Sequence, residues 1–449
     1  MRTVAVIGAS LAGLSAARSL REQGFDGRLI LIGDELHRPY DRPPLSKEFL
    51  AGALTEADLS LEADGEDLRA EWLLGARATG LDRADDTGRA DRSGHAVRDP
   101  TGHAVRDRTG QAVRDRTGHG VRDRTGHAVS DRTRHAVRLA DGQAVRADGV
   151  VIATGAVART LPGSEGLAGV HTLRTLDDAR SLRDELAAGG RLVVIGAGFI
   201  GAEVASTAYA LGLDVTVVEA APTPLAGPLG ATMGGIVSAL HADHGVRLLC
   251  GVGVKGLSGD GRSGTGDPAD GVRGRVDAVL LEDGRTVPAD IVVVGVGARP
   301  CVEWLEGSGV ELDDGVKCGA DGRTSLAGVV AVGDCANWYD ARAGAHHRVE
   351  HWTGARERPA VAVATLLAGG AVEPGVPRPP YFWSDQYGVR IQFAGHAAAA
   401  DSVTIEAGVA DDRDVLAVYR RAGFPVAVLG MNQPRLFTRW RKLLAAAST

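Results

Sequence analysis

The chain has 449 residues, of which 44% are hydrophobic and 24% charged, and its formal net charge is −7. These values are typical of a soluble globular protein with two or three domains, and they argue against general binding to nucleic acid or anionic membranes. No apolar run approaches the roughly 18 residues that span a membrane, and the cysteines form no C-x-x-C pair that would indicate a metal or redox site.

The first motif is a glycine-rich turn near the N-terminus. Val4–Gly13 reads VAVIGASLAG, an apolar strand that runs into the start of a helix. Gly8 permits the tight turn and Gly13 lets the helix pack on the strand, whereas Ser10 replaces the glycine that usually faces a pyrophosphate. The helix N-terminus would offer its N–H groups to phosphates. We therefore predict a dinucleotide site here; the alternative is a glycine-rich turn without a ligand. Because the first strand begins at Thr3, we expect no signal peptide and a cytoplasmic protein.

An acidic pair and a basic loop follow. The predicted strand Leu29–Ile32 leads to Asp34 and Glu35, where an acid should bind a ribose hydroxyl of the dinucleotide. The next loop, Tyr40–Lys47 (YDRPPLSK), combines two prolines with two cations, Arg42 and Lys47. A solvated basic loop is the alternative interpretation of these cations.

A tandem repeat interrupts the first half of the chain. Ser93–Arg138 repeats an octad close to TGHAVRDR, and we place the insertion at about residues 88–136. Each repeat offers only Ala and Val for burial, so we expect a mobile, hairpin-like surface excursion. Metal binding by its histidines and nucleic-acid binding are the alternatives. Leu139–Ala153 then reads as strand, Asp-Gly turn, strand, so the insertion should leave the functional sites unaffected.

A second fingerprint begins about 190 residues after the first. The strand Arg191–Ile195 precedes a full G-x-G-x-x-G motif, whose candidate cofactor contacts are Gly196, Gly198, Ile200 and Gly201. The following strand, Asp214–Val218, ends at Glu219. A carboxylate at this position accepts hydrogen bonds from the ribose of NADH and repels the 2′-phosphate of NADPH. We therefore predict an NADH site, and we expect the dipole of the first helical turn to stabilise Glu203.

The last third of the chain returns to the first domain and then adds another. Gly295–Pro300 closes the nicotinamide domain, and its Gly297 is placed to face the nicotinamide. Val329–Asp334 (VVAVGD) reads as a strand that ends in Gly-Asp. After a Pro/Gly-rich linker, Gly369–Pro380, the segment Tyr381–Gly388 (YFWSDQYG) opens a predicted α/β unit with a basic end.

Two dinucleotide sites on one chain indicate a flavin site and a nicotinamide site, between which a hydride can pass. The order and spacing of the motifs GASLAG, RPPLSK, ATGA, GAGFIGAE, GDCA, VEHW and YFWSDQYG resemble the FAD-dependent NADH:ferredoxin reductases. These are the putidaredoxin reductase-like proteins and the reductase components of aromatic-ring dioxygenases. The resemblance covers nearly the whole chain apart from the repeat.

The resemblance implies roles for particular residues. Ala12 and Asp34 would contact the AMP half of FAD, Ala78 its adenine end, and Trp352 would border the flavin ring. Lys47 would lie near the ring with Arg42 nearby, whereas Arg159 and Asp334 would hold the pyrophosphate and ribityl region. It also implies a Lys47–Glu203 ion pair close to flavin N5, and these two are the candidate catalytic residues.

The implied fold is α/β and glutathione-reductase-like, with two Rossmann-like domains and a small C-terminal α+β domain. We expect residues 1–160 and 288–375 to bind FAD, residues 161–287 to bind NAD, and residues 376–449 to form the C-terminal domain.

The implied function is hydride transfer from NADH to FAD, followed by single-electron transfer to an acidic [2Fe–2S] ferredoxin that serves a cytochrome P450 or a dioxygenase. The terminal basic cluster is a candidate docking site for that ferredoxin. A rubredoxin- or nitrite-reductase-linked reductase and a non-enzymatic NADH sensor remain alternatives. A disulfide reductase would need a cysteine beside the flavin, and His37–Lys47 has none.

Overall fold

A computed structural model describes residues 1–83, 135–259, 274–341, 344–373 and 378–446 of the chain. Most of the octad repeat lies outside the described residues. The end of its last unit is described: His135–Arg138 form most of strand β5, so the expectation of a mobile surface segment is wrong for these four residues. The predictions made for residues 88–134 are therefore neither supported nor contradicted by the structure.

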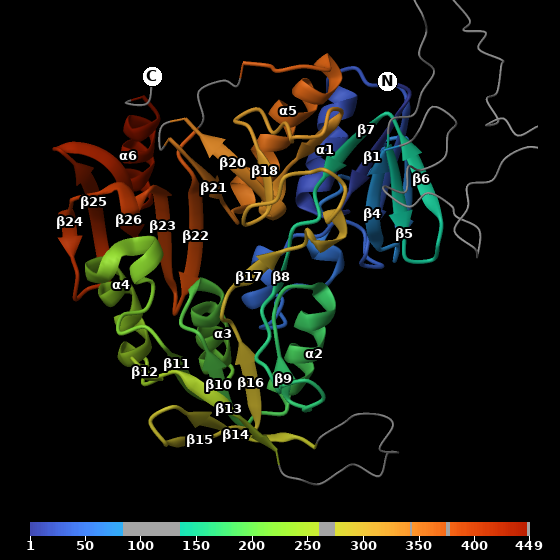
Figure 1. Ribbon diagram of the computed structural model, residues 1–449. Helices are drawn as coiled ribbons and strands as arrows, with labels where there is room; N and C mark the ends of the chain where they lie inside the picture. The colour runs from blue at the N-terminus through green and yellow to red at the C-terminus, as the bar shows by residue number, and fades with distance from the viewer. Residues whose placement is uncertain (84–134, 260–273, 342–343, 374–377, 447–449) are drawn as a thin grey trace, which may run out of the picture.

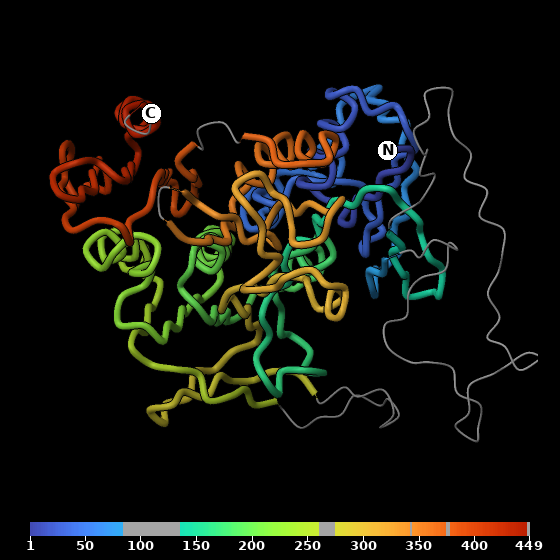
Figure 2. Tube along the Cα trace, turned by 45° about the horizontal axis from the view of Figure 1, so that its top comes forward, coloured from blue at the N-terminus to red at the C-terminus, as the bar shows by residue number. Residues whose placement is uncertain are grey.

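The first Rossmann-like sheet is parallel and takes strands from distant parts of the chain. Its order is β19-β7-β1-β2-β3. The bounds are β1 Thr3–Ile7, β2 Arg28–Gly33, β3 Ala70–Leu74, β7 Gly149–Ile152 and β19 Val329–Ala331. Helices α1 (Leu11–Glu22) and α5 (Trp352–Ala368) lie side by side against it, although they come from opposite halves of the chain (Figures 1 and 2).

A short antiparallel sheet flanks the first Rossmann-like sheet. It has the order β4-β5-β6, with β4 Ala78–Arg83, β5 His135–Leu139 and β6 Ala144–Ala147. The Asp-Gly turn and the strands predicted on both sides of it are thus present. The strand before the turn, β5, begins earlier than predicted, and the strand after it is divided into β6 and β7. Val137 and Leu139 of β5 are buried in the core of the first domain.

The second Rossmann-like sheet is also parallel, with the order β12-β11-β10-β16-β9. Its strands are β9 Val170–His171, β10 Arg191–Ile195, β11 Asp214–Glu219, β12 Arg247–Cys250 and β16 Ile291–Val294. Its helices are α2 Leu176–Ala187, α3 Phe199–Ala210 and α4 Ala226–Asp243. An antiparallel sheet lies below it in Figure 1, formed by β13 Val254–Gly259, β14 Val276–Leu281 and β15 Thr286–Pro288.

Two smaller strand groups connect the parts. A two-stranded ribbon, β8 (Ala156–Ala158) with β17 (Ala298–Pro300), passes between the two Rossmann-like sheets (Figure 1). Three further strands precede α5, namely β18 Val316–Cys318, β20 Ala336–Asp340 and β21 Ala345–Arg348. Short 3-10 turns complete the described structure: η1 Pro43–Ser46, η2 Ala57–Leu59, η4 Glu303–Leu305, η5 Gly333–Cys335 and η6 Ala397–Ala399.

The C-terminal part is a five-stranded antiparallel sheet with one helix. The order β22-β23-β26-β25-β24 comprises β22 Tyr381–Gln386, β23 Val389–Gly395, β24 Ser402–Val409, β25 Asp414–Arg421 and β26 Phe424–Met431. Helix α6 (Pro434–Ala446) covers one face through Phe437 and Leu444.

The other face of the C-terminal sheet packs on α4. Leu229, Met233, Val237 and Leu240 of this helix share a hydrophobic core with Ile391, Phe393, Val415 and Leu429 of the sheet. The hydroxyl of Tyr419 also donates to the carbonyl of Leu229 at 2.7 Å. The C-terminal sheet is therefore joined by an apolar core to the second Rossmann-like unit.

The fold class predicted from the sequence is confirmed, because two parallel sheets and a C-terminal α+β unit are present. The pairing of β19 with β7 supports a discontinuous first domain. The four domain boundaries stay a prediction. Among the described helices, none is long and apolar enough to cross a bilayer.

Candidate functional site

A large cleft lies where the three parts of the molecule meet. Its volume is about 1140 Å³, and both fingerprint turns, the Tyr40–Lys47 loop and β22 line it. Most of the predicted site residues line this cleft: Gly8, Ser10, Ala12, Asp34, Glu35, Arg42, Lys47, Ala78, Gly198, Ile200, Gly201, Glu203, Gly297, Asp334 and Trp352. Gly13, Arg159, Gly196 and Glu219 do not belong to its lining.

The first fingerprint forms a tight turn between β1 and α1. Gly8 has φ of +119°, and a Cβ at this residue would lie 2.0 Å from the carbonyl oxygen of Ala153. A Cβ on Gly13 would lie 1.8 Å from the carbonyl oxygen of Gly8. Only glycine fits at either position, so Gly13 acts through packing rather than by lining the cleft. Ser10 is the N-cap of α1 but makes no side-chain bond to the first turn.

The second fingerprint repeats this arrangement between β10 and α3. Gly196 has φ of +98°, and its Cβ would meet the carbonyl oxygen of Gly295 at 2.4 Å, while that of Gly201 would meet Gly196 at 2.1 Å. Gly198, the N-cap of α3, faces open space. The carboxylate of Glu219 accepts the backbone N–H groups of Ala197 and Ala221, both at 2.8 Å.

These two turns fit the groups that the sequence implies. A pyrophosphate needs close backbone approach and unpaired N–H groups at a helix start. Ser10 leaves the first turn of α1 without a side-chain cap, and Gly198 has no side chain to offer α3. The donor set and the space at both turns therefore suit two anionic dinucleotides.

The two acids after β2 have different partners. Asp34 forms an exposed ion pair with Arg77 at 2.7 Å. Glu35 accepts the hydroxyl of Tyr40 at 2.5 Å and the guanidinium of Arg42 at 2.6 Å. Burial raises the pKa of Tyr40, which keeps its hydroxyl protonated and able to donate. Both acids remain candidates for the ribose contact.

Lys47 and Glu203 form the expected ion pair, with Nζ and Oε2 3.0 Å apart. Both side chains are largely buried. The predicted cause was wrong in one respect: α3 begins at Phe199, and Glu203 lies beyond its first turn, which contains no acid. Hydroxyl donors replace the helix dipole, because Ser46 and Ser384 both donate to the Glu203 carboxylate.

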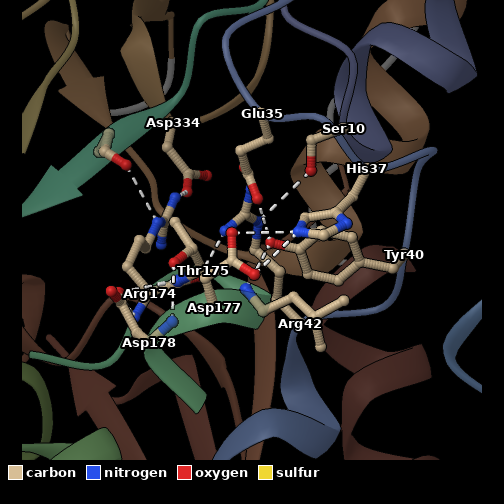
Figure 3. Close-up of polar contacts among 12 residues, drawn as sticks. Ser10, Glu35, His37, Tyr40, Arg42, Arg174, Thr175, Asp177, Asp178 and Asp334 are labelled. Carbon is tan, nitrogen blue, oxygen red and sulfur yellow. Dashed lines mark hydrogen bonds and ion pairs between the residues drawn. The ribbon is translucent and has the colours of Figure 1, made fainter. Parts of the chain in front are cut away.

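A second ion pair, partly buried and not revealed by the sequence, joins Arg174 to Asp334 at 2.5 Å (Figure 3). Arg174 Nε also donates to the carbonyl of Ala156 at 3.0 Å, and the carbonyl oxygen of Arg174 accepts from Arg42. The local pattern at Thr175 indicates only a helix start, since Thr175 and Asp178 form a capping box.

Arg159 follows strand β8 and lies outside the lining of the cleft. Its side chain is exposed and donates to the carbonyl of Ala298 at 3.2 Å on the β8–β17 ribbon. In the structure Arg174, rather than Arg159, is the arginine that contacts Asp334 in the cleft. The contact of Arg159 with FAD stays a prediction.

The family model for pyridine nucleotide-disulphide oxidoreductases matches residues 2–358, and a reductase C-terminal model matches residues 381–449. The chain belongs to the pyridine nucleotide-disulphide oxidoreductase family. It is thus an oxidoreductase of a flavin- and NADH-using family. A relative from Cupriavidus sp. (strain PS12), named chlorobenzene dioxygenase, ferredoxin reductase component, is 36% identical over 99% of this chain and 92% of its own length.

Other relatives of this oxidoreductase carry similar names. Rhodocoxin reductase of Rhodococcus erythropolis is 34% identical over 99% of this chain and 89% of its own. Among solved structures, the ferredoxin reductase for the CYP199A2 system from Rhodopseudomonas palustris has a TM-score of 0.81 and 31% identity, covering 100% of this chain and 95% of its own. The covalent putidaredoxin reductase–putidaredoxin complex also has a TM-score of 0.81, with 29% identity over 99% and 93% of the two chains.

The oxidoreductase has no disulfide: all four cysteines are free. Cys301 lines the cleft, and burial raises the pKa of its thiol. Cys335 is fully buried, which raises its pKa to about 11. Both thiols are therefore poor nucleophiles near neutral pH. Within the described part of the chain, no three His, Cys, Asp or Glu side chains gather as a metal site.

Proposed function

We propose that this protein is an FAD-dependent NADH:ferredoxin oxidoreductase that supplies a [2Fe–2S] ferredoxin of a cytochrome P450 or ring-hydroxylating dioxygenase system. One observation carries the proposal: a single cleft is lined by two dinucleotide turns and by the C-terminal sheet. The names of relatives that match along the whole chain support the ferredoxin as the acceptor.

The proposed cofactor contacts fall into two groups. FAD is held by the first fingerprint, the acids after β2, the basic loop and residues that reach the cleft from later elements: Gly8, Ser10, Ala12, Asp34, Glu35, Arg42, Lys47, Ala78, Asp334 and Trp352. Gly13 contributes by letting α1 pack closely on the first fingerprint turn. NADH is held by Gly196, Gly198, Ile200, Gly201, Glu219 and Gly297. Arg159 is proposed to help hold the pyrophosphate and ribityl region of FAD; it lies beside Gly297, whose Cβ would lie 3.9 Å from Arg159 Cδ. The four domain boundaries given above belong to the same proposal.

A bound flavin supplies the chemistry of the reaction, since it accepts two electrons from NADH and releases them singly. The chain's own residues bind, orient and shield. Lys47 is a fixed cation in the cleft, held by Glu203, and Glu203 is held by two serine hydroxyls. Such preorganised charges need no rearrangement during the reaction, which is why they are effective.

The acceptor side of the proposal rests on aromatic residues and charge. Trp352 and Trp383 both line the cleft, with ring centroids 5.9 Å apart in an edge-to-face arrangement. The basic residues Arg435, Arg439, Arg441 and Lys442 on α6 provide charge complementarity to an acidic ferredoxin. A reductase that serves a rubredoxin or a nitrite reductase would need the same cleft for its cofactors, so the acceptor must be tested directly.

The test is NADH-driven cytochrome c reduction by the purified protein, with and without a [2Fe–2S] ferredoxin from the same host. The proposal predicts a released chromophore with the mass of FAD and a strong dependence of the rate on ferredoxin. Flavin reduction without this dependence points to another acceptor. Slow flavin reduction with a long-lived charge-transfer complex points to an NADH sensor, and absence of flavin overturns the proposal.

A further inference from the structure

The most deeply buried polar cluster of the cleft centres on Glu203, which is only 5% exposed. Its Oε2 faces Lys47 at 3.0 Å and accepts from Ser46, both of which belong to the basic loop. Its Oε1 accepts from Ser384 of β22 at 2.7 Å. The two oxygens of one carboxylate thus contact two different parts of the molecule.

Ser384 is itself held in one orientation. It has no exposed surface, and Gln386, which is 1% exposed, donates its Nε2 to Ser384 Oγ at 3.0 Å. Because that oxygen already accepts a hydrogen bond, the single hydroxyl proton of Ser384 is directed to Glu203. Alternation along β22 places Ser384 and Gln386 on the same face of the strand.

From these contacts we infer that Ser384, oriented by Gln386, is a positioning residue for the Lys47–Glu203 pair. The hydrogen bond to Oε1 prevents rotation of the carboxylate, so Oε2 stays opposite the Lys47 ammonium. The C-terminal sheet therefore completes the charged centre of the cleft in addition to covering it. This inference rests on the proposed function, in which Lys47 lies beside the flavin.

The energetic reason is burial of the charge. A carboxylate removed from water is costly unless each oxygen has a partner, and a charge-assisted hydrogen bond inside a protein is stronger than a neutral one. With Ser384 absent, Oε1 has lost a donor and the negative charge near the flavin is less compensated. The ion pair then loosens, and the flavin becomes harder to reduce.

The test compares Ser384→Ala with Ser206→Ala in the FAD-loaded, full-length protein. Ser206 is the matched control: it lies on α3, the helix of Glu203, and its hydroxyl oxygen accepts the backbone N–H of Tyr387 at 2.7 Å rather than donating to Glu203. We expect flavin reduction by NADH to slow on the order of tenfold in Ser384→Ala. The flavin midpoint potential of Ser384→Ala should also fall. In Ser206→Ala the rate should stay within about twofold of that of the parent, and the potential should be unchanged.

A double-mutant cycle separates positioning from general loosening of the fold. In a Glu203→Gln background, Ser384→Ala should cause no further slowing, because its effect passes through the carboxylate. An additive loss, or equal rates and potentials in Ser384→Ala and the parent, would overturn the inference. Ser384→Cys fills the site with a larger side chain that is only a weak donor, and it should resemble Ser384→Ala, which makes loss of the donor rather than loss of volume the cause. If the parent binds no FAD or is not reduced by NADH, the proposed function fails, and the inference fails with it.

Discussion

The indole N–H of Trp352 donates to the carboxylate of Asp41 at 2.8 Å, although 311 positions separate the two residues. The contact links the start of α5 to the loop that carries Lys47, and both side chains line the cleft. Burial raises the pKa of Asp41, while the Trp352 hydrogen bond and the charge of Lys47 partly offset that effect.

This raised pKa has a testable consequence for stability. The folded protein holds the Asp41 proton more tightly than the unfolded chain, so the contribution of Asp41 to stability falls as pH rises from the ordinary aspartate pKa through the raised value. Asp41→Asn keeps an acceptor for Trp352 and removes the charge. We expect the melting temperature of Asp41→Asn minus that of the parent to be larger at neutral than at acidic pH.

Asp58 provides the control for that experiment. The Thr55 hydroxyl and backbone N–H lower the pKa of this exposed carboxyl. Its contribution to stability is therefore present at neutral pH and lost as pH falls through the lowered value. Asp58→Asn should show the opposite trend to Asp41→Asn. The same trend in both variants would contradict the assignment.

Removal of Arg174 should affect both stability and flavin retention. Arg174 and Asp334 are 21% and 16% exposed, so Arg174→Ala leaves a mostly buried carboxylate without its cation. We expect the free energy of unfolding to fall by about 1.5–3 kcal/mol. FAD should also be released more readily upon dilution, because Asp334 lines the cleft.

The matched variant is Arg180→Ala, which removes ion pairs with Glu56 and Asp177 on the surface. Exposed pairs of this kind contribute at most about 1 kcal/mol. Chemical denaturation measures the free energy of unfolding of both variants. An equal loss in the two would mean that the Arg174–Asp334 pair stabilises the fold no more than an exposed ion pair does.

Glu219 should determine the preference for NADH over NADPH. Two backbone N–H groups fix its carboxylate at the end of β11. Glu219→Gln removes the charge that repels a 2′-phosphate, so the ratio of kcat/KM for NADPH to that for NADH should rise on the order of tenfold or more. Asp214→Asn, at the exposed start of the same strand, should leave the ratio unchanged.

Deletion of residues 88–134 should preserve flavin content and NADH oxidation. Arg83 at the end of β4 lies opposite His135 at the start of β5, so the deletion leaves residues 84–87 as a short hairpin loop. Loss of flavin or of activity would show that the repeat has a role. Extending the deletion to residue 139 removes β5, whose Val137 is fully buried, and should abolish flavin loading.

The parts of the fold that depend on local sequence were predictable. The turns at Gly8 and Gly196 need glycine because a Cβ would collide with the neighbouring strand, and such turns occur at a fixed spacing. The strands at Arg191–Ile195 and Asp214–Glu219 are short apolar runs that parallel sheets bury on both faces.

The parts of the site that depend on packing were not predictable from the residues alone. Ser384 and Arg174 have no local signature, and each matters only because another segment presents a carboxylate to it. The Lys47–Glu203 pair was expected only from resemblance to a family. The helix dipole was a wrong explanation for Glu203, because a sequence pattern leaves the first helical residue uncertain by a few positions, and Glu203 lies just beyond the first turn of α3.

The apolar core between α4 and the C-terminal sheet limits how the cleft can open. Since Leu229, Met233 and Leu240 bury themselves against that sheet, β22 cannot act as an independent lid. It travels with the half of the molecule that carries the second fingerprint. The basic loop is anchored to the same half, because Tyr40, Leu45 and Phe49 share an apolar core with residues of that unit such as Val204. Lys47 therefore stays beside Glu203 as long as that core is intact.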